Sequence, residues 1–250
     1  MSEISRRKLL TAGLFAGASG LAAAVAFGRR LGLVPPDSAG IWGPGETLTY
    51  GAHRLLGKNS TAREFSAEMI SKAPFANEVT PLGEKFEQLQ ANGFADWRVD
   101  VGGMVAKPMS LSIADIKRFP ESRQITEVAC EEGWSYIAQW IGTPLANILT
   151  AAGALPAARY LVYYSHQEDW WESIDMDEAM HPQTLLTWGM NDGELPVVFG
   201  GPLRLRVPRQ LGYKSVKYVT RLTVTDSMKG FGKGLGSVSP ETGYSWYAGI

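Results

Sequence analysis

The sequence predicts an α+β fold, in which mixed β-sheets are combined with short helices. After residue 45, segments with the apolar pattern of strands outnumber segments with helical periodicity, and the helical ones are short. The chain has no internal repeat and no regular strand–helix–strand period, so we do not expect a parallel α/β fold. With 250 residues, of which 45% are hydrophobic, it is long enough to bury a large core.

Two helices are predicted from the residues at their ends. Ser112–Phe119 opens with serine, a favourable N-cap, and carries Asp115 at its fourth position. Pro144–Ala152 begins with proline and ends before Gly153, which is the usual order of these residues at helix ends. Further short helices are expected at Glu64–Lys72, Leu82–Ala91 and Asp175–Met180.

Strands are predicted where apolar residues alternate with polar ones or form short continuous runs. Trp97–Val101 alternates and precedes an expected turn at Gly102-Gly103, and Tyr160–Tyr164 has the pattern of a buried strand. Further strands are expected at Gln124–Cys130, Thr184–Met190, Leu203–Val207 and Ser215–Asp226.

Composition and motifs exclude several classes of protein. The net charge is −1 and the pI about 6.3, so we expect no nucleic-acid partner. The glycine-rich segment Gly230–Gly236 lacks the spacing of a dinucleotide-binding loop and is expected to be a flexible surface loop. Cys130 is the single cysteine, which excludes an intrachain disulfide and any cysteine-rich metal site.

The N-terminal segment has the pattern of an export signal. The basic stretch Ser5–Leu10 contains paired arginines, like a twin-arginine signal, and precedes the uncharged apolar run Thr11–Phe27. This route carries folded proteins across the bacterial inner membrane, so the pattern predicts a periplasmic protein. Leu9–Phe27 is also close to the ~20 residues that span a bilayer, so retention as an N-terminal membrane anchor is the alternative.

These signals predict three parts of the chain. Residues 1–30 form the export signal or anchor, residues 31–45 form a linker with three prolines, and residues 46–250 form the folded domain. Structural cysteines of exported proteins usually occur in pairs, so the unpaired Cys130 needs another explanation.

Charge is segregated along the second half of the chain. Tyr160–Leu195 contains eight acidic residues and no lysine or arginine, whereas Gly201–Lys233 contains eight basic residues and one acid. Two readings remain open. The segments either form solvated faces that pair with each other, or the basic one binds a multiply charged anion.

Cys130 is the candidate catalytic residue. Glu131 and Glu132 follow it directly and oppose ionisation of the thiol, which disfavours a cysteine nucleophile. A soft metal would bind the sulfur regardless, because coordination deprotonates a thiol. A buried inert thiol is the other alternative. Since one cysteine cannot hold a catalytic metal alone, the remaining ligands would come from a cofactor.

Several sequence blocks follow one another in a fixed order from Cys130 onward. They are Cys130–Ser135, Trp140–Leu145, Glu172–Ile174, Ala179–Leu186, Met190–Asp192, Leu195-Pro196, Gly201–Pro208 and Leu211–Tyr218. In this order they resemble the sulfite oxidase superfamily of molybdopterin-binding oxidoreductases, and most closely its periplasmic branch of protein-methionine-sulfoxide reductase catalytic subunits. The resemblance extends from about Trp97 to Asp226, over half the chain.

The resemblance implies a sulfite-oxidase-like fold and a molybdenum centre held by one molybdopterin, whose pyranopterin carries a single dithiolene. Cys130 would be the protein ligand of the metal, and Arg204 takes the position of the pterin-binding arginine. The segment from Gly212 through Lys214, Ser215, Val216 and Lys217 matches the one whose amides and lysines cradle the pterin phosphate. Three further residues stand at or near cofactor-contacting positions of the family, namely His53, Arg54 and Ser165.

The implied activity is two-electron oxygen-atom transfer on a sulfur or nitrogen oxide or oxyanion, either a small molecule or protein-bound. Electrons would be exchanged with a redox partner, a membrane haem protein or a soluble cytochrome, because the sequence shows no haem domain. Trp170, Trp171 and Trp246 are candidates for the substrate approach, although aromatic residues more often pack in the core, which is the favoured interpretation.

Two alternatives to this activity stay open, and so does its direction. The chain would otherwise be a non-catalytic periplasmic binding module of the same fold, or a metal-free thiol enzyme that uses Cys130. A sulfite oxidase would need several arginines converging on the metal. A sulfoxide reductase would need a more open pocket that admits an apolar thioether.

Overall fold

The computed structural model describes residue 28, residues 32–77 and residues 82–250. The predicted export signal, residues 1–30, lies outside these ranges except for Gly28. Contacts divide the chain into unit 1, Met1–Gly57, and unit 2, Lys58–Ile250. None of the described helices combines the length and apolar character that crossing a membrane requires.

Unit 1 contains one described helix, α2 (Gly43–Leu56), which the sequence did not predict. Pro44 lies in its first turn, where the missing N–H costs nothing, and the Thr47 hydroxyl donates to the Gly43 carbonyl, 2.8 Å away. The helix and the residues just before it expose five large apolar side chains, which are Ile41, Trp42, Leu48, Leu55 and Leu56.

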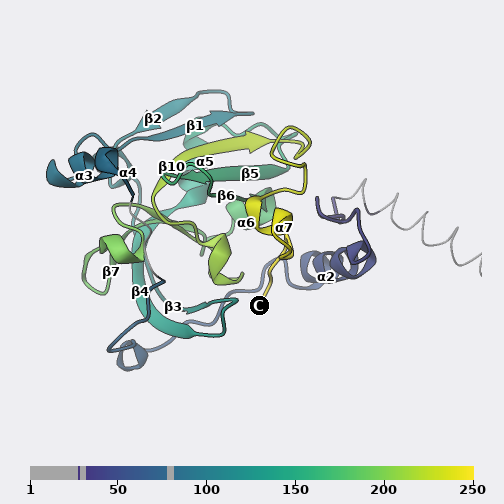
Figure 1. Cartoon of the computed structure of the whole chain (residues 1–250), viewed down its shortest axis with the longest axis horizontal. Helices are drawn as coiled ribbons and strands as arrows, with labels where there is room; N and C mark the ends of the chain where they lie inside the picture. Colours follow the sequence, from purple (N-terminus) through teal and green to yellow (C-terminus); the bar gives the residue numbers. More distant parts are fainter. Residues whose placement is uncertain (1–27, 29–31, 78–81) are drawn as a thin grey trace, which may run out of the picture. The chain divides into compact units, whose positions relative to one another are not determined.

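Unit 2 consists of short helices and strands (Figure 1). Its helical elements are η1 (Ala67–Met69), α3 (Glu84–Ala91), α4 (Ile113–Ile116), α5 (Leu145–Ala152), α6 (Met176–Ala179), η2 (Val197–Phe199), η3 (Gly212–Lys214) and α7 (Val238–Glu241). Its strands are β1 (Val99–Gly103), β2 (Met109–Leu111), β3 (Ser122–Ala129), β4 (Ser135–Pro144), β5 (Tyr160–Ser165), β6 (Trp171–Asp175), β7 (Leu185–Met190), β8 (Gly193–Glu194), β9 (Arg204–Arg206) and β10 (Val219–Thr225). This composition is the predicted α+β class.

The strands form one mixed and one antiparallel sheet. The first has the order β2-β1-β10-β5-β6, and the second has the order β3-β4-β7-β8, with β9 also paired to β7. The β1–β10 pair is parallel and the remaining pairs are antiparallel. The largest core cluster draws on strands of both sheets and on α5. A second, smaller cluster packs around β3, β4 and the end of η2 and includes Val128, Tyr136, Trp140 and Phe199.

The predictions made from N-cap, proline and glycine residues agree well with the observed helix ends. The Ser112 hydroxyl accepts from the Asp115 N–H and the Asp115 carboxylate accepts from the Ser112 N–H, so α4 begins with a complete capping box. Helix α5 follows Pro144 and ends at Gly153, whose φ of +67° is the left-handed conformation of a helix end. The prediction of α5 is confirmed. That of α4 is confirmed at its start, but the helix ends at Ile116 instead of Phe119.

Two strand boundaries were predicted wrongly. Gly102-Gly103 is not a turn but the end of β1, where both residues pair with β10. An added Cβ at Gly103 would lie 2.1 Å from the Val224 carbonyl oxygen, so the close pairing requires glycine there. The strand expected from Ser215 begins only at Val219, since the preceding residues form a turn in which Tyr218 has a φ of +57°.

Candidate active site

Cys130 lies at the tip of the β3–β4 hairpin. The Cys130 N–H donates to the Trp134 carbonyl at 2.9 Å, and the Gly133 N–H donates to the Cys130 carbonyl at 3.1 Å. Gly133 has a φ of +91°, a conformation that glycine adopts without strain and that lets this short loop close. Two long paired strands thus hold the sulfur-bearing residue on a rigid support.

The segment Gly212–Tyr218 faces this hairpin tip. An added Cβ at Gly212 would lie 3.3 Å from the Ala129 carbonyl oxygen and 3.5 Å from the Cys130 Cα, so glycine permits the close approach of the two loops. The Ser215 hydroxyl accepts from Arg206 Nη1 at 3.0 Å and from the Val207 N–H at 3.1 Å. These bonds fix the segment and leave the hydroxyl hydrogen of Ser215 available to a ligand.

A cavity of about 330 Å³ lies between these loops, within the size range of ligand sites. Its walls come from the hairpin tip, the Gly212–Tyr218 segment and the turn between β5 and β6. The lining residues are Asn77, Val128, Cys130, Glu131, Glu132, Trp134, Gln167, Trp170, Arg204, Gly212, Tyr213, Ser215, Val216, Lys217 and Tyr218. We call it the Cys130 cavity.

Two cationic side chains, Arg204 and Lys217, face the Cys130 cavity and have N–H donors that no described residue accepts from. Arg204 Nε donates to the Ser215 carbonyl at 2.9 Å and Nη1 to the Phe199 carbonyl at 3.0 Å, while Nη2 has no acceptor among the described residues. Lys217 Nζ donates to the Val198 carbonyl at 2.8 Å and keeps two further N–H groups. Burial and the neighbouring Arg204 lower the pKa of Lys217 to about 8.

Backbone donors complete this cationic side. In the described part of the chain, the amide N–H groups of Val216 and Lys217 have no protein acceptor. Successive free amides beside two cations form a cradle for an anion, and hydrogen bonds from charged donors to such an anion are the stronger kind.

The opposite side of the cavity is acidic and aromatic. The Cys130 thiol donates to Glu131 Oε2 at 3.3 Å, and the Trp134 indole donates to Glu132 Oε2 at 2.7 Å. Burial, together with the neighbouring Glu131 and Glu132 carboxylates, raises the pKa of the Cys130 thiol to about 11. A thiol in this setting is a poor nucleophile at neutral pH, which argues against the metal-free thiol enzyme.

The structure brings together six of the residues predicted from sequence, which are Cys130, Arg204, Gly212, Ser215, Val216 and Lys217. Lys214 is a correction, because its side chain does not line the cavity. It is fully buried, and its Nζ lies 2.7 Å from Glu172 Oε2 and 3.1 Å from Ser237 Oγ. The 3₁₀ turn η3 directs Lys214 into the protein, where a carboxylate of β6 neutralises it.

The remaining predicted site residues lie elsewhere. Ser165 lines a neighbouring groove instead of the Cys130 cavity, and its hydroxyl accepts from the Gln167 N–H at 3.1 Å. His53 and Arg54 belong to the last turn of α2 in unit 1, where Arg54 is buried over the Tyr50 ring. The expected role of Ser165, His53 and Arg54 in cofactor binding stays a prediction.

The three tryptophan candidates for the substrate approach have different positions. Trp170 lines the Cys130 cavity. Trp171 packs against the Tyr164 and Phe231 rings, and Trp246 is buried with its indole donating to Ser173 Oγ at 2.7 Å. Trp171 and Trp246 therefore follow the favoured interpretation of packing residues, and Trp170 is the candidate that lines the cavity.

Both readings of the segregated charges are partly correct. Lys214 pairs with Glu172, and Arg209 pairs with Glu178 at 3.6 Å, so members of the basic and acidic segments do bind each other, although inside the protein. Arg204 and Lys217 face the cavity instead, where they are placed for an anion.

The Lys214–Glu172 pair predicts a large effect on stability. Replacing Lys214 with Met leaves a buried carboxylate without its partner, which costs about 3–5 kcal/mol. We expect the Lys214→Met variant to melt roughly 10 °C below wild type in a calorimetric scan at fixed rate. The control Arg123→Met, which breaks an exposed pair with Glu121, should melt close to wild type. Equal melting of Lys214→Met and wild type would show that the pair contributes little.

Known proteins resemble this chain over the same region. A family model described as the oxidoreductase molybdopterin-binding domain matches residues 87–231, more than half of the chain. The chain belongs to this family. The matched range contains Cys130 and both cations of the cavity.

Individual relatives agree with the family. The chain is 33% identical over 195 residues to a protein of Azospira oryzae named as a protein-methionine-sulfoxide reductase subunit, YedZ1, with 78% of this chain and 70% of the relative covered. It is 33% identical over 146 residues to the protein-methionine-sulfoxide reductase catalytic subunit MsrP of Campylobacter jejuni, covering 52% of this chain and 49% of the relative. The chain thus spans about half the length of that MsrP.

A solved structure supports the fold. The sulfane dehydrogenase SoxCD from Paracoccus pantotrophus matches 53% of this chain and 39% of its own chain, with 25% identity and a TM-score of 0.51. Fold, family and relatives together show that the chain is a molybdopterin-dependent oxidoreductase with a sulfite-oxidase-like fold, and that its cofactor is molybdenum with molybdopterin.

The residues of the Cys130 cavity fit this cofactor. One sulfur lies beside the cavity instead of being enclosed by hydrocarbon, and Cys130 is therefore placed to bind the metal. Arg204 Nη2, Lys217 Nζ and the free amides of Val216 and Lys217 offer several donors to the pterin phosphate. The Ser215 hydroxyl adds another donor.

Sequence reasoning missed several residues that line the cavity, among them Trp134, Gln167 and Tyr218. Trp134 was visible in the motif after Cys130 but carried no assigned role. Gln167 had no local signal, because its position in the cavity depends on the β5–β6 turn reaching the hairpin tip from another sheet.

Proposed function

We propose that this enzyme reduces neutral sulfoxides. The observation that carries the proposal is the acidic and aromatic side of the Cys130 cavity, formed by Glu131, Glu132, Trp134 and Trp170. Carboxylates beside the metal ligand repel an anionic substrate, whereas aromatic rings give an apolar surface to a thioether group. The Trp134 ring also packs against Phe75, with centroids 4.9 Å apart, which extends the apolar wall.

Sulfite fits this cavity less well. Recognition of a small dianion calls for several cations that converge on it. The cavity offers Arg204 and Lys217, and both are placed for the pterin phosphate. The guanidinium of Arg206 is fully buried and bonds Ser215 Oγ, Thr126 Oγ1 and the Glu127 carbonyl, so it is not directed at a substrate.

The names of the relatives support the same substrate class. Both reductase relatives are named for protein-bound methionine sulfoxide. Because the chain spans only about half of the MsrP relative, we carry this substrate over as part of the proposal: the sulfoxide belongs to a methionine, free or within a polypeptide.

The reaction removes one oxygen atom from sulfur. A sulfoxide, two electrons and two protons give a thioether and one water molecule. The bound molybdenum supplies the two-electron oxygen-atom transfer. The chain holds the metal through Cys130, anchors the cofactor phosphate through Arg204 and Lys217, and orients the thioether along Trp134 and Trp170. We propose that a separate redox partner, a membrane haem protein or a soluble cytochrome, supplies the electrons.

A comparison of two assays on the same preparation tests this function. The holoenzyme should oxidise reduced viologen dye when methionine sulfoxide or dimethyl sulfoxide is added. With sulfite and an artificial electron acceptor, the rate should be at least about 100-fold lower. Fast sulfite oxidation with no sulfoxide reduction would reverse the proposed direction and substrate.

The proposed location is the periplasm, reached by the twin-arginine route. The paired arginines Arg6 and Arg7 before the apolar run support export. The large apolar side chains that α2 and its preceding residues expose in unit 1 are compatible with retention near a membrane. Replacing Arg6 and Arg7 with lysine should leave the protein in the cytoplasmic fraction, while wild type fractionates with the periplasm or its membrane. Unchanged fractionation would contradict this route.

A further inference from the structure

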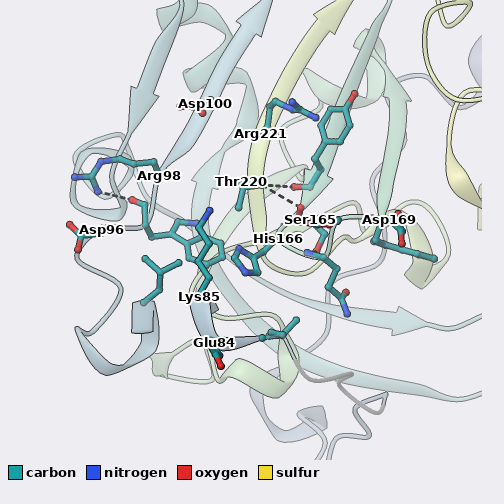
Figure 2. Close-up of a pocket in the computed structure, with 18 residues that line it drawn as sticks. Glu84, Lys85, Asp96, Arg98, Asp100, Ser165, His166, Asp169, Thr220 and Arg221 are labelled. Atoms are coloured by element: carbon teal, nitrogen blue, oxygen red, sulfur yellow. Dashed lines mark hydrogen bonds between the residues drawn. The ribbon is translucent and has the colours of Figure 1, made fainter. Parts of the chain in front are cut away.

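A second, larger hollow adjoins the Cys130 cavity. It has a volume of about 1020 Å³, roughly three times that of the Cys130 cavity. Figure 2 shows its walls, which come from α3, the residues before β1, the strands β1 and β10, and the β5–β6 turn. We call it the large groove. Most of its lining residues lie outside the Cys130 cavity.

The large groove and the Cys130 cavity share a wall. Gln167 and Trp170 of the β5–β6 turn line both. The turn is held in place by hydrogen bonds from the Ser165 N–H to the Trp170 carbonyl and from the His166 N–H to the Tyr218 carbonyl, at 2.9 and 2.7 Å. A molecule that reaches across this turn can therefore occupy both spaces at once.

Charges of both signs line the groove without pairing. The cations are Lys85, Arg98 and Arg221, and the acids are Glu84, Asp96, Asp100, Glu168 and Asp169. Within the described part of the chain, none of these eight side chains forms an ion pair. Figure 2 shows the labelled ones spread around the groove instead of gathered at one end. Arg221 lies flat on the Tyr164 ring, 3.8 Å from its centroid, so its position is fixed.

These properties select the kind of molecule that fits. A small anion is disfavoured, because five carboxylates face three cations. A small apolar molecule is disfavoured by the charged rim. A polypeptide segment matches the groove in size and brings its own charges of both signs, together with backbone donors and acceptors for polar groups such as Ser165 and Thr220.

We propose that the large groove binds the polypeptide on either side of an oxidised methionine whose side chain enters the Cys130 cavity past Trp170. This inference rests on the proposed sulfoxide reductase function and adds to it a binding site for the main chain of the substrate. The groove residues then determine specificity: they favour sulfoxides within extended polypeptide over free ones, while the chemistry stays in the Cys130 cavity.

Substrate length and charge provide the test. Holoenzyme with reduced viologen is given methionine sulfoxide blocked at both ends, and two nonapeptides with a central methionine sulfoxide flanked by glutamates or by lysines. For wild type, both nonapeptides should have KM values at least about tenfold below that of the blocked amino acid. In the double variant Lys85→Glu and Arg221→Glu, KM for the glutamate peptide should rise at least about fivefold.

The same double variant should leave KM for the lysine peptide no higher than in wild type, and kcat/KM for the blocked amino acid within about twofold. The control Lys107→Glu and Lys229→Glu changes the net charge equally at exposed positions outside the groove and should not alter any KM. Equal KM values for long and short substrates in wild type would overturn the proposal. So would an equal loss for all three substrates in the double variant, because a groove that binds the main chain of the substrate must affect the peptides more than the blocked amino acid.

Direct binding separates this proposal from the proposed function. Fluorescence anisotropy of the labelled glutamate peptide with holoenzyme should give a Kd that rises at least about fivefold in the double variant. If wild type reduces no sulfoxide, the proposed function fails, and this Kd shift still supports the groove. Absence of peptide binding, or an unchanged Kd, overturns the groove proposal whatever the enzymatic activity.

Discussion

Replacing Cys130 with serine is expected to abolish sulfoxide reduction and to remove most of the molybdenum from the protein. A serine hydroxyl is a much weaker ligand for a soft metal than a thiolate. We expect the activity to fall on the order of 100-fold or more, which corresponds to about 2.7 kcal/mol or more in the activation barrier. Metal analysis of protein exported from a host that makes molybdopterin measures the molybdenum per chain.

The pterin content of the same variant is a control. Arg204, Lys217 and the amides of the cradle are unchanged, so Cys130→Ser should retain part of the pterin. The substitution preserves size, and the apoprotein should melt within a few degrees of wild type. Wild type without molybdenum and pterin would favour the non-catalytic binding module. Full activity of a metal-free preparation would favour the thiol enzyme.

Replacing Lys217 with methionine is expected to weaken cofactor binding while leaving the metal ligand intact. Hydrogen bonds to charged groups contribute about 1.5–3 kcal/mol, so pterin affinity should fall roughly 10- to 150-fold. The measurement is pterin per chain, determined by fluorescence after oxidation, in protein made with limiting cofactor. Added cofactor should restore activity, because Cys130 and the substrate wall are unchanged.

Lys229→Met is the matched control, since Lys229 is an exposed lysine of the same basic segment that does not line the Cys130 cavity. It should bind as much pterin as wild type. Loss of the fold in Lys217→Met would appear as a lower melting temperature of the apoprotein. We expect only a small decrease, since the Val198 carbonyl that Lys217 contacts remains exposed to water. Wild-type pterin content in Lys217→Met would contradict the phosphate role.

Much of the fold could be predicted from local signals. Helices α4 and α5 were readable because serine, proline and glycine stand at their ends. Helix α2 was missed because Gly43, Pro44 and Gly45 make its first turn look like a linker. Strand β4 was missed although Tyr136, Ala138 and Trp140 alternate with less buried residues, so here the periodic signal was present.

Residues of the candidate site could be predicted from sequence only where a family motif specifies the role of the residue at that position. Cys130 and Arg204 follow from such motifs. Lys214 and Lys217 look equivalent in sequence, yet one is neutralised by Glu172 inside the protein and the other faces the cavity. Which lysine meets the internal carboxylate depends on strand β6, which is distant in sequence, and local reasoning could not decide it.

The coordination of molybdenum tests the central claim most directly. X-ray absorption at the molybdenum edge counts the sulfur atoms bound to the metal in the holoenzyme. Wild type should show one more sulfur neighbour than Cys130→Ser that retains some metal, because the protein thiolate adds to those of the dithiolene. Identical sulfur shells in the two proteins would show that Cys130 does not bind the metal and would contradict the account.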